Sequence, residues 1–307
     1  MKKVAISIGD LNGIGIQLAL NSHNKIKRYV NPVYVIDKRM LKQASKLLKV
    51  DIPKDFHTIS PKAPYFQIKP AKVSKKSGFY SFKSFQKAIE LAHTNKVDAI
   101  CTLPIHKKAW ESAGVSYKGH TDALRDIFDS EAIMMLGCPQ MYVALYTEHI
   151  PLKSVASQID VDRLVRFFCD FYQTAKPTSQ VAVLGLNPHA GDSGVLGDEE
   201  IAITQAIDIA HKELGSKEIF TDPMVPDVAF IPRQRERYRY YIAMYHDQGL
   251  TPLKALHFDE SINISLNLPI LRTSVDHGTA FDIAYTQQTP DATSYINALE
   301  YIRESLS

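Results

Sequence analysis

Residues 240–250 read YYIAMYHDQGL and place a histidine and an aspartate directly after an apolar run. The run from Tyr240 to Met244 predicts a buried strand, because short apolar segments bounded by polar residues are typical of parallel sheets. His246 and Asp247 then stand where the strand is expected to give way to a loop, and Gly249 is expected to make room for the turn. Ligands of α/β proteins bind at this edge of the sheet. The stretch therefore predicts a functional site at a strand end.

The composition indicates a soluble globular protein with one large domain or two medium ones. The chain has 307 residues, of which 45% are hydrophobic and 22% are charged. A net charge of +3 is too small and too dispersed to indicate nucleic-acid binding, and no apolar run approaches the roughly 18 residues of a membrane span. The densest basic stretch, Arg233, Arg235, Arg237 and Arg239, alternates with period two, which predicts one solvated face of an edge strand or extended loop.

The cysteines indicate a reducing compartment. Cys101, Cys138 and Cys169 are widely spaced and odd in number, and no CxxC motif occurs. This pattern is typical of buried thiols in a cytosolic protein, and not of disulfides or a zinc knuckle. The first apolar run reaches Gly9 and Asp10 almost at once, which is too short for a signal peptide. We therefore expect a cytoplasmic protein.

Apolar strand patterns alternate with helical patterns along the chain. The predicted strands cover residues 3–8, 33–37, 97–103, 132–136, 141–146, 180–186, 228–231, 240–245 and 263–266. The predicted helices cover residues 16–28, 38–49, 107–113, 123–128, 160–175, 198–214 and 291–305, and a further helical stripe runs from Phe79 to Ala92. The strands at 132–136 and 141–146 are close enough to form a hairpin. This alternation predicts an α/β/α architecture with a largely parallel sheet.

Two loops have features of anion sites. The segment from Gly9 to Gly15 lies between a predicted strand and a helix, which fits a phosphate- or nucleotide-facing loop. Neither GxGxxG nor GxxxxGK spacing is present, so a tight structural turn fits equally well. Gly119, His120 and Thr121 stand at the exposed start of another predicted helix, where an anion would be favoured.

Three histidines follow apolar strands, either directly or within a few residues: His149, His189 and His246. Three neutral imidazoles with open positions beside them are the pattern of a catalytic divalent metal. Asp247 and Asp192 could orient the imidazole N–H groups. The alternative is that each histidine is a hydrogen-bonded strand terminus, and the spacing leaves both interpretations open.

A second group of polar residues follows His246. Lys254, Asn263 and Arg272 are spaced by nine residues and surrounded by apolar segments. A lysine, an asparagine and an arginine that converge on one pocket suit a phosphate or carboxylate. Solvated side chains are the alternative for each of them.

Four longer motifs carry a resemblance to a known family. They are KGHT at 118–121, LNPHAG at 186–191, MYHDQG at 244–249 and RTSVDHGTA at 272–280. In this order they resemble the signatures of the 4-hydroxythreonine-4-phosphate dehydrogenases of pyridoxal phosphate biosynthesis. The stretch HGTAFDIA at 277–284 also resembles the cofactor loop of the isocitrate and isopropylmalate dehydrogenases.

The resemblance implies an isopropylmalate dehydrogenase-like fold, with two α/β/α domains and an active-site cleft between them. Residues 1–128 and 255–307 would form the first, cofactor-side domain. Residues 129–254 would form the second domain, which carries the metal ligands and the dimer contacts. A homodimer with shared active sites is implied as well.

The resemblance also implies a set of site residues. The metal ligands would be His149, His189 and His246, and they would hold one divalent ion: zinc, magnesium or cobalt. The substrate-binding residues would be His120, Thr121, Lys254, Asn263 and Arg272. The cofactor, NAD or NADP, would contact His277, Gly278, Thr279, Ala280 and Asp282. Asp247, Asp227 and Lys254 are the candidates for catalytic roles.

The implied reaction is the NAD-dependent oxidation of 4-phosphooxy-L-threonine to a β-keto acid, which decarboxylates to 3-amino-2-oxopropyl phosphate. The alternatives are a related decarboxylating dehydrogenase for another phosphorylated hydroxy acid, a metal-dependent hydrolase and a non-catalytic phosphate-binding protein. The chain departs from the family in two segments. Residues 9–17 read GDLNGIGIQ where the family has GDPxGIGPE, and Tyr285, Thr286 and Gln287 stand where glycines are common.

Overall fold

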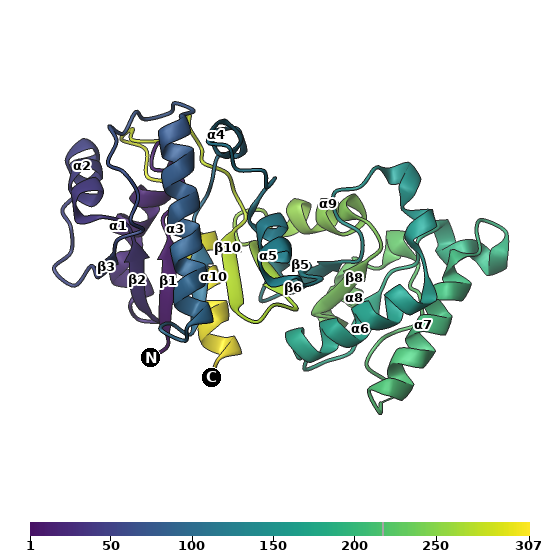
Figure 1. Cartoon of the computed structure of the whole chain (residues 1–307). Coiled ribbons are helices and arrows are strands. Elements are labelled where there is room, and N and C mark those ends of the chain that lie inside the picture. Colours follow the sequence, from purple (N-terminus) through teal and green to yellow (C-terminus); the bar gives the residue numbers. More distant parts are fainter. Residues whose placement is uncertain (217) are drawn as a thin grey trace. The chain divides into compact units, whose positions relative to one another are not determined.

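Strands alternate with helices in two units of the chain, which the computed structural model describes for residues 1–216 and 218–307 (Figure 1). Unit 1 comprises Met1–Ser130, Ile262–Ile264 and Leu268–Ser307, and unit 2 comprises Glu131–Ser261 and Ser265–Asn267. Residues 255–261 thus belong to unit 2, whereas the sequence-based boundary assigns them to the first domain. None of the helices in these described ranges is long and apolar enough to cross a bilayer.

Unit 1 is built on parallel strands. They are β1 (Lys3–Ser7), β2 (Asn31–Val35), β3 (Thr58–Ile59), β4 (Ala99–Thr102) and β10 (Leu271–Val275), in the spatial order β3-β2-β1-β4-β10. Its helices are α1 (Gly15–Ile26), α2 (Lys38–Leu48), α3 (Lys75–His93), α4 (Lys107–Ser112), α5 (His120–Phe128) and α10 (Thr293–Ser305). Every residue of β4 is buried, as expected of a parallel strand with helices over both faces. Phe85 and Trp110 anchor the core between the helices and the sheet.

Unit 2 holds the second part of the sheet. Its strands are β5 (Ile133–Cys138), β6 (Met141–Leu145), β8 (Tyr240–Ala243) and β7 (Val181–Val183), in that spatial order. The α-helices are α6 (Val161–Ala175), α7 (Glu199–Glu213), α8 (Pro232–Arg237) and α9 (His246–His257), and the 3₁₀ segments are η1 (Leu152–Ser154), η2 (Ala156–Gln158), η3 (Pro188–Gly194) and η4 (Pro226–Val228). The remaining strand β9 (Ile262–Leu266) is divided between the units.

The predicted α/β class with a mostly parallel sheet is confirmed by these pairings. β5 and β6 form the predicted antiparallel hairpin, with Cys138 opposite Met141. β8 runs parallel to both β6 and β7. The carboxyl ends of these three strands therefore lie at the same edge of the sheet.

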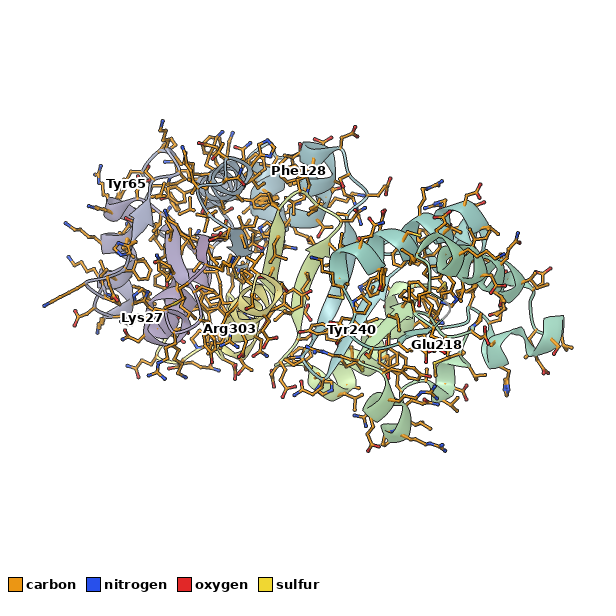
Figure 2. The ribbon with its side chains drawn as sticks, turned by 90° about the horizontal axis from the view of Figure 1, so that it is seen from below. Lys27, Tyr65, Phe128, Glu218, Tyr240 and Arg303 are labelled. Atoms are coloured by element: carbon orange, nitrogen blue, oxygen red, sulfur yellow. The ribbon has the colours of Figure 1, made fainter. Side chains whose placement is uncertain are left out.

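The prediction for the arginine-rich stretch is wrong. Residues 228–231 do not form a strand, and Arg233, Arg235 and Arg237 lie on helix α8 or at its end. Pro232 occupies the first helical position after an extended Ile231, where its fixed φ favours a helix. Arg239 follows the helix, and its guanidinium lies 5.8 Å from the ring of Tyr240, which is labelled in Figure 2.

The predicted loop after β8 is also wrong, because α9 begins at His246 itself. Gly249 is a helical residue, and it lets this helix pack closely on the sheet. A Cβ at Gly249 would lie 2.4 Å from Cγ1 of Val143 and 2.8 Å from Cβ of Ala243. The glycine therefore fixes how deeply α9 sits on β6 and β8.

Replacing Gly249 by alanine should destabilise the fold, although alanine favours a helix by about 1 kcal/mol. Overpacking against Val143 and Ala243 should lower the free energy of unfolding by about 1–3 kcal/mol in urea denaturation. Gly119→Ala is the matched control, because a Cβ at Gly119 would meet no atom within 4 Å. A Gly249→Ala protein as stable as the wild type would contradict the close packing of α9.

Candidate active site

The three histidines predicted to bind a metal all follow strands of unit 2. His149 lies four residues after β6, His189 lies within η3 after β7, and His246 is the first residue of α9 after β8. The ring centroids of His149 and His246 are 5.4 Å apart. The segments after three neighbouring strands thus carry the three imidazoles.

Hydrogen bonds around Met244 join these strand ends. The Met244 carbonyl accepts from the Thr147 hydroxyl at 2.6 Å and from the Thr147 backbone N–H at 3.2 Å. The Met244 N–H donates to Oε1 of Gln248 at 2.7 Å, and Nε2 of the same side chain donates to the Gly185 carbonyl at 2.6 Å. Thr147 and Gln248 therefore connect the segments that carry His149 and His189 to the start of α9. Sequence reasoning assigned no role to either residue.

The segment around His189 has an unusual backbone. Residues 189–193 all have positive φ, from 43° at Asp192 to 80° at Gly191. L-residues adopt this conformation at a cost of about 1–2 kcal/mol each. Asn187 holds the segment to α7, since its N–H donates to Glu200 at 2.7 Å and its Nδ2 donates to Glu199 at 2.6 Å.

The donor chemistry of the trio fits a divalent cation. Nδ1 of His246 lies 2.7 Å from Oδ1 of Asp247, which leaves Nε2 for a ligand. Asp247 thus has the contact predicted for it, and Asp192 lies within the left-handed segment. In this structure, which describes all three imidazoles, their ligand atoms do not form a group within 4.8 Å of one another. Coordination would therefore need a movement, and the His189 segment is the part under backbone strain.

Unit 1 contains a buried cationic site around Arg272. This residue of β10 is 2% exposed, and its guanidinium donates to Oγ1 of Thr102 at 2.8 and 3.2 Å and to Oδ1 of Asn263 at 3.2 Å. Burial lowers the pKa of Arg272 to about 10, so the side chain stays charged at neutral pH. Arg272 and Asn263, which the resemblance assigns to one substrate, are therefore in contact.

His120 and Thr121 form the start of α5, and each is 8% exposed. Burial and the nearby Arg272 charge lower the pKa of His120 well below its ordinary value, so the imidazole is neutral at pH 7. It packs edge-on against Phe85 and Trp110, and its buried Nε2 has no hydrogen-bond partner in the described chain. A polar atom of this kind beside a buried cation fits a site for an anionic ligand.

The proposed catalytic residues lie in unit 2. Lys254 belongs to α9, and its ammonium lies 5.3 Å from the ring centroid of Phe258. Asp227 is exposed within η4, and Asp247 is exposed in the first turn of α9.

The loop after β1 and the loop predicted to hold the cofactor are in contact. The Ile14 N–H donates to the Thr279 carbonyl at 3.1 Å, and a Cβ at Gly13 would lie 2.8 Å from Cβ of Thr279. Nε2 of His277 is buried, with no hydrogen-bond partner among residues 1–216 and 218–307. This atom fits a bound group with a polar edge. Of the other predicted cofactor residues, Gly278 and Asp282 are exposed and Ala280 has a φ of 41°.

The two segments that depart from the family pattern also meet here. The Tyr285 hydroxyl donates to the Leu11 carbonyl at 2.7 Å, and Nε2 of Gln17 donates to the Gln288 carbonyl at 3.2 Å. The Tyr285–Leu11 bond therefore joins the two altered segments directly, and the bond from Gln17 reaches the residue that follows the second one.

Asp10 is a buried titratable group that the sequence interpretation did not single out. Its carboxyl accepts from the Asn12 N–H at 2.9 Å and from the Ser77 hydroxyl at 3.2 Å. Burial raises the pKa of Asp10 to about 6, against the lowering effect of these hydrogen bonds. The adjacent Gly9-Asp10 pair was visible in the sequence, but its burial was not.

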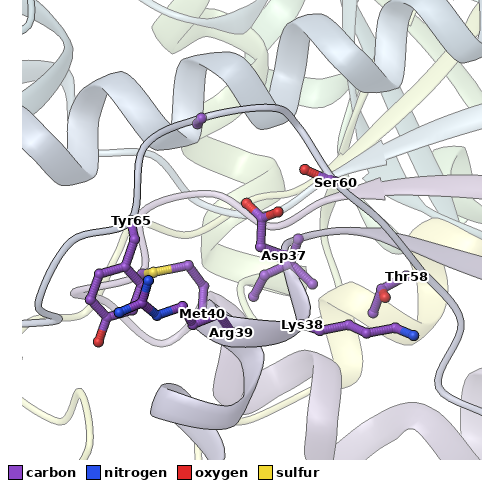
Figure 3. Close-up of a pocket in the computed structure, with 9 residues that line it drawn as sticks. Asp37, Lys38, Arg39, Met40, Thr58, Ser60 and Tyr65 are labelled. Atoms are coloured by element: carbon purple, nitrogen blue, oxygen red, sulfur yellow. The ribbon is translucent and has the colours of Figure 1, made fainter.

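A cavity of about 450 Å³ lies at the carboxyl end of β2 (Figure 3). Asp37, Arg39, Ser60 and Tyr65 are among its lining residues, and the Arg39 guanidinium lies 3.8 Å from the Tyr65 ring centroid. None of the site residues predicted from the sequence lines this cavity.

A mostly parallel sheet with helices between its strands, histidines after three strands and a buried arginine on another are the features of an α/β enzyme. Residues 28–302 match the family described as pyridoxal phosphate biosynthetic protein PdxA. The 4-hydroxythreonine-4-phosphate dehydrogenase of Sulfurimonas denitrificans is 56% identical over 97% of this chain and 96% of its own length. The crystal structure of that enzyme from Klebsiella pneumoniae gives a TM-score of 0.83 at 29% identity, covering 99% of this chain and 100% of the other. Isocitrate dehydrogenase from Methylococcus capsulatus shares the fold, with a TM-score of 0.52 at 13% identity over 100% of this chain and 86% of the other. The chain therefore belongs to the PdxA family, which confirms the resemblance drawn from its motifs.

Gln248→Leu should destabilise unit 2, because the Met244 N–H and the Gly185 carbonyl would lose their partner. We expect the free energy of unfolding to fall by about 2 kcal/mol or more in urea denaturation. Gln173→Leu, at an exposed position of α6, is the control and should change stability little. Equal effects of the two substitutions would rule out a joining role for Gln248.

The raised pKa of Asp10 gives a pH-dependent stability. Between about pH 4 and 6 the folded chain keeps a proton that the unfolded chain has released, so stability falls as the pH rises through this window. Asp10→Asn should flatten this decline and raise stability at pH 7 by about 2–3 kcal/mol. Denaturation at several pH values measures the effect, with the exposed Asp51→Asn as control. If both variants keep the wild-type pH profile, Asp10 does not titrate as stated.

Proposed function

We propose that this protein oxidises the secondary alcohol of 4-phosphooxy-L-threonine with NAD or NADP. The β-keto acid product then loses carbon dioxide to give 3-amino-2-oxopropyl phosphate, a step of pyridoxal phosphate biosynthesis. The observation that carries the proposal is the 56% identity, over 97% of the chain, to a dehydrogenase named for this substrate. The buried Arg272 supports it, because a phosphorylated substrate needs a fixed cation.

The substrate would be held through its anionic groups by Arg272, Lys254, His120, Thr121 and Asn263. Thr102 and Asn263 fix the Arg272 guanidinium before a substrate arrives, which lowers the entropy lost on binding. Lys254 offers a second cation on α9. The neutral imidazole of His120 can donate a hydrogen bond to an anion without adding charge, since its pKa is lowered.

His149, His189 and His246 would hold the divalent ion, for which zinc, magnesium and cobalt are the candidates. Such an ion would supply positive charge beside the reacting oxygen, which would favour both the oxidation and the loss of carbon dioxide. Asp247 accepts the Nδ1 hydrogen of His246 and so fixes the ring that would bind. Asp247, Asp227 and Lys254 are our candidates for proton transfer.

The nicotinamide cofactor would contact His277, Gly278, Thr279, Ala280 and Asp282, and it accepts the hydride when bound. The buried Nε2 of His277 supports this assignment, because it requires a polar partner. The backbone bond from Ile14 to Thr279 keeps the loop in place.

We further propose a cytoplasmic homodimer whose subunits share their active sites. The three cysteines are free thiols, two of them buried, which fits a reducing compartment.

The test combines the purified protein with a divalent metal, NAD or NADP and 4-phosphooxy-L-threonine, and follows the absorbance of the reduced cofactor. His246→Ala should lower turnover by at least roughly 100-fold, because several kcal/mol of charge stabilisation would be lost. Arg272→Met should mainly raise KM, by about 10-fold or more, because a charged hydrogen bond to the substrate is lost. The exposed His57→Ala variant is the control and should behave as the wild type.

Two results would favour an alternative function, and a third would contradict the assigned metal ligands. Reduced cofactor formed only with another phosphorylated hydroxy acid would indicate a related dehydrogenase. Release of phosphate without any cofactor would indicate a hydrolase. Full activity of His246→Ala would show that the assigned metal ligands are wrong.

A further inference from the structure

Unit 2 contains a second group of metal-ligating side chains, apart from the three histidines. Cys138 ends β5, His257 ends α9, and Glu260 follows three residues later. One ligand atom from each residue lies within 4.8 Å of the other two. The metal histidines do not form so close a group in the described chain. The most compact set of soft and hard donors therefore lies outside the predicted active site.

The three side chains are already in contact. Nδ1 of His257 lies 3.0 Å from Oε2 of Glu260, and the Cys138 thiol interacts with the same carboxylate. The side chains of His257 and Glu260 are 16% and 47% exposed, whereas Cys138 is fully buried. The group thus has a buried sulfur on one side and access to solvent on the other.

Opposing effects act on the Cys138 thiol. Burial raises the pKa of its thiol, and the Glu260 charge adds to this effect. Backbone hydrogen bonds from Gln140 and Met141, at the tip of the β5–β6 hairpin, act in the opposite direction. A bound cation would replace the hydrogen that the thiol and the carboxylate share.

We propose that Cys138, His257 and Glu260 bind a zinc-like divalent cation, with water or another ligand at the fourth position. Tetrahedral zinc, with bonds of about 2.0–2.3 Å, separates its ligands by roughly 3.5 Å. Nδ1 of His257 and Oε2 of Glu260, at 3.0 Å, are already near that separation, and all three ligand atoms lie within 4.8 Å of one another, so small side-chain movements would close the group.

Donor chemistry distinguishes this site from the histidine trio. A thiolate selects zinc, cobalt(II) or cadmium and discriminates against magnesium, whereas three imidazoles provide no sulfur. The cation would join the β5–β6 hairpin to the C-terminal end of α9, whose first residue is His246. The cation would thus link two elements of unit 2, and its loading does not depend on turnover.

Cobalt(II) titration of the full-length protein tests the site, because a cobalt–thiolate bond gives a near-ultraviolet charge-transfer band that cobalt–imidazole bonds lack. The wild type and His246→Ala should each show this band, at an intensity that corresponds to one cobalt–thiolate site per chain. Cys138→Ser should lose the band. Cys169→Ser is the matched control, because Cys169 also lies beside a carboxylate, 3.4 Å from Glu213, and it should keep the band.

If Cys138→Ser does not fold, variants of the two less buried ligands, His257 and Glu260, test the site instead. His257→Gln and Glu260→Gln should each raise the Kd for cobalt, measured from the charge-transfer band, by at least roughly tenfold, because a ligand is lost. Equilibrium dialysis with zinc should give one ion fewer per chain for these variants than for the wild type. The proposal is overturned if the wild type shows no band, if Cys138→Ser keeps it, or if both glutamine variants bind cobalt as the wild type does.

Discussion

The hydrogen bonds at Met244 are the constraint on which the arrangement of the three histidine segments in unit 2 depends. Its carbonyl receives two bonds from Thr147, and its N–H engages Gln248, which reaches on to Gly185. Parallel strands bring their carboxyl ends to one edge of the sheet. The pairing of the strands does not, however, fix the position of the segments that follow them. The bonds at Met244 do so, because they tie the segments after β6 and β7 to the first turn of α9.

A different principle organises the residues of unit 1. Arg272 is a fully buried cation whose guanidinium is held by the oxygens of Thr102 and Asn263. Burial, together with the Arg272 charge, lowers the pKa of the neighbouring His120 and keeps its imidazole neutral. Burying a cation costs solvation free energy, and a bound phosphate or carboxylate would offset part of that cost. The charged and polar groups are thus held in position before a ligand binds, which is characteristic of preorganised sites.

Sequence patterns predicted the α/β class, the β5–β6 hairpin and the family, because these depend on periodicity and on motifs that are local in the chain. They did not predict that α9 begins at His246, since a glycine three residues later indicates a loop when its close packing on Val143 is unknown. Nor could they show that Tyr285 bonds to Leu11, because the two segments are joined only by the fold. The burial of Asp10 and the grouping of Cys138 with His257 were hidden for the same reason.

The left-handed run from His189 to Ser193 has a consequence for how this segment can move. Four of its five residues are not glycine, so the backbone holds unfavourable energy that a relaxed loop would not have. Any change that returns these residues to negative φ releases that energy. The bonds from Asn187 to Glu199 and Glu200 therefore act against a stored strain, and loosening them favours a shift of the segment.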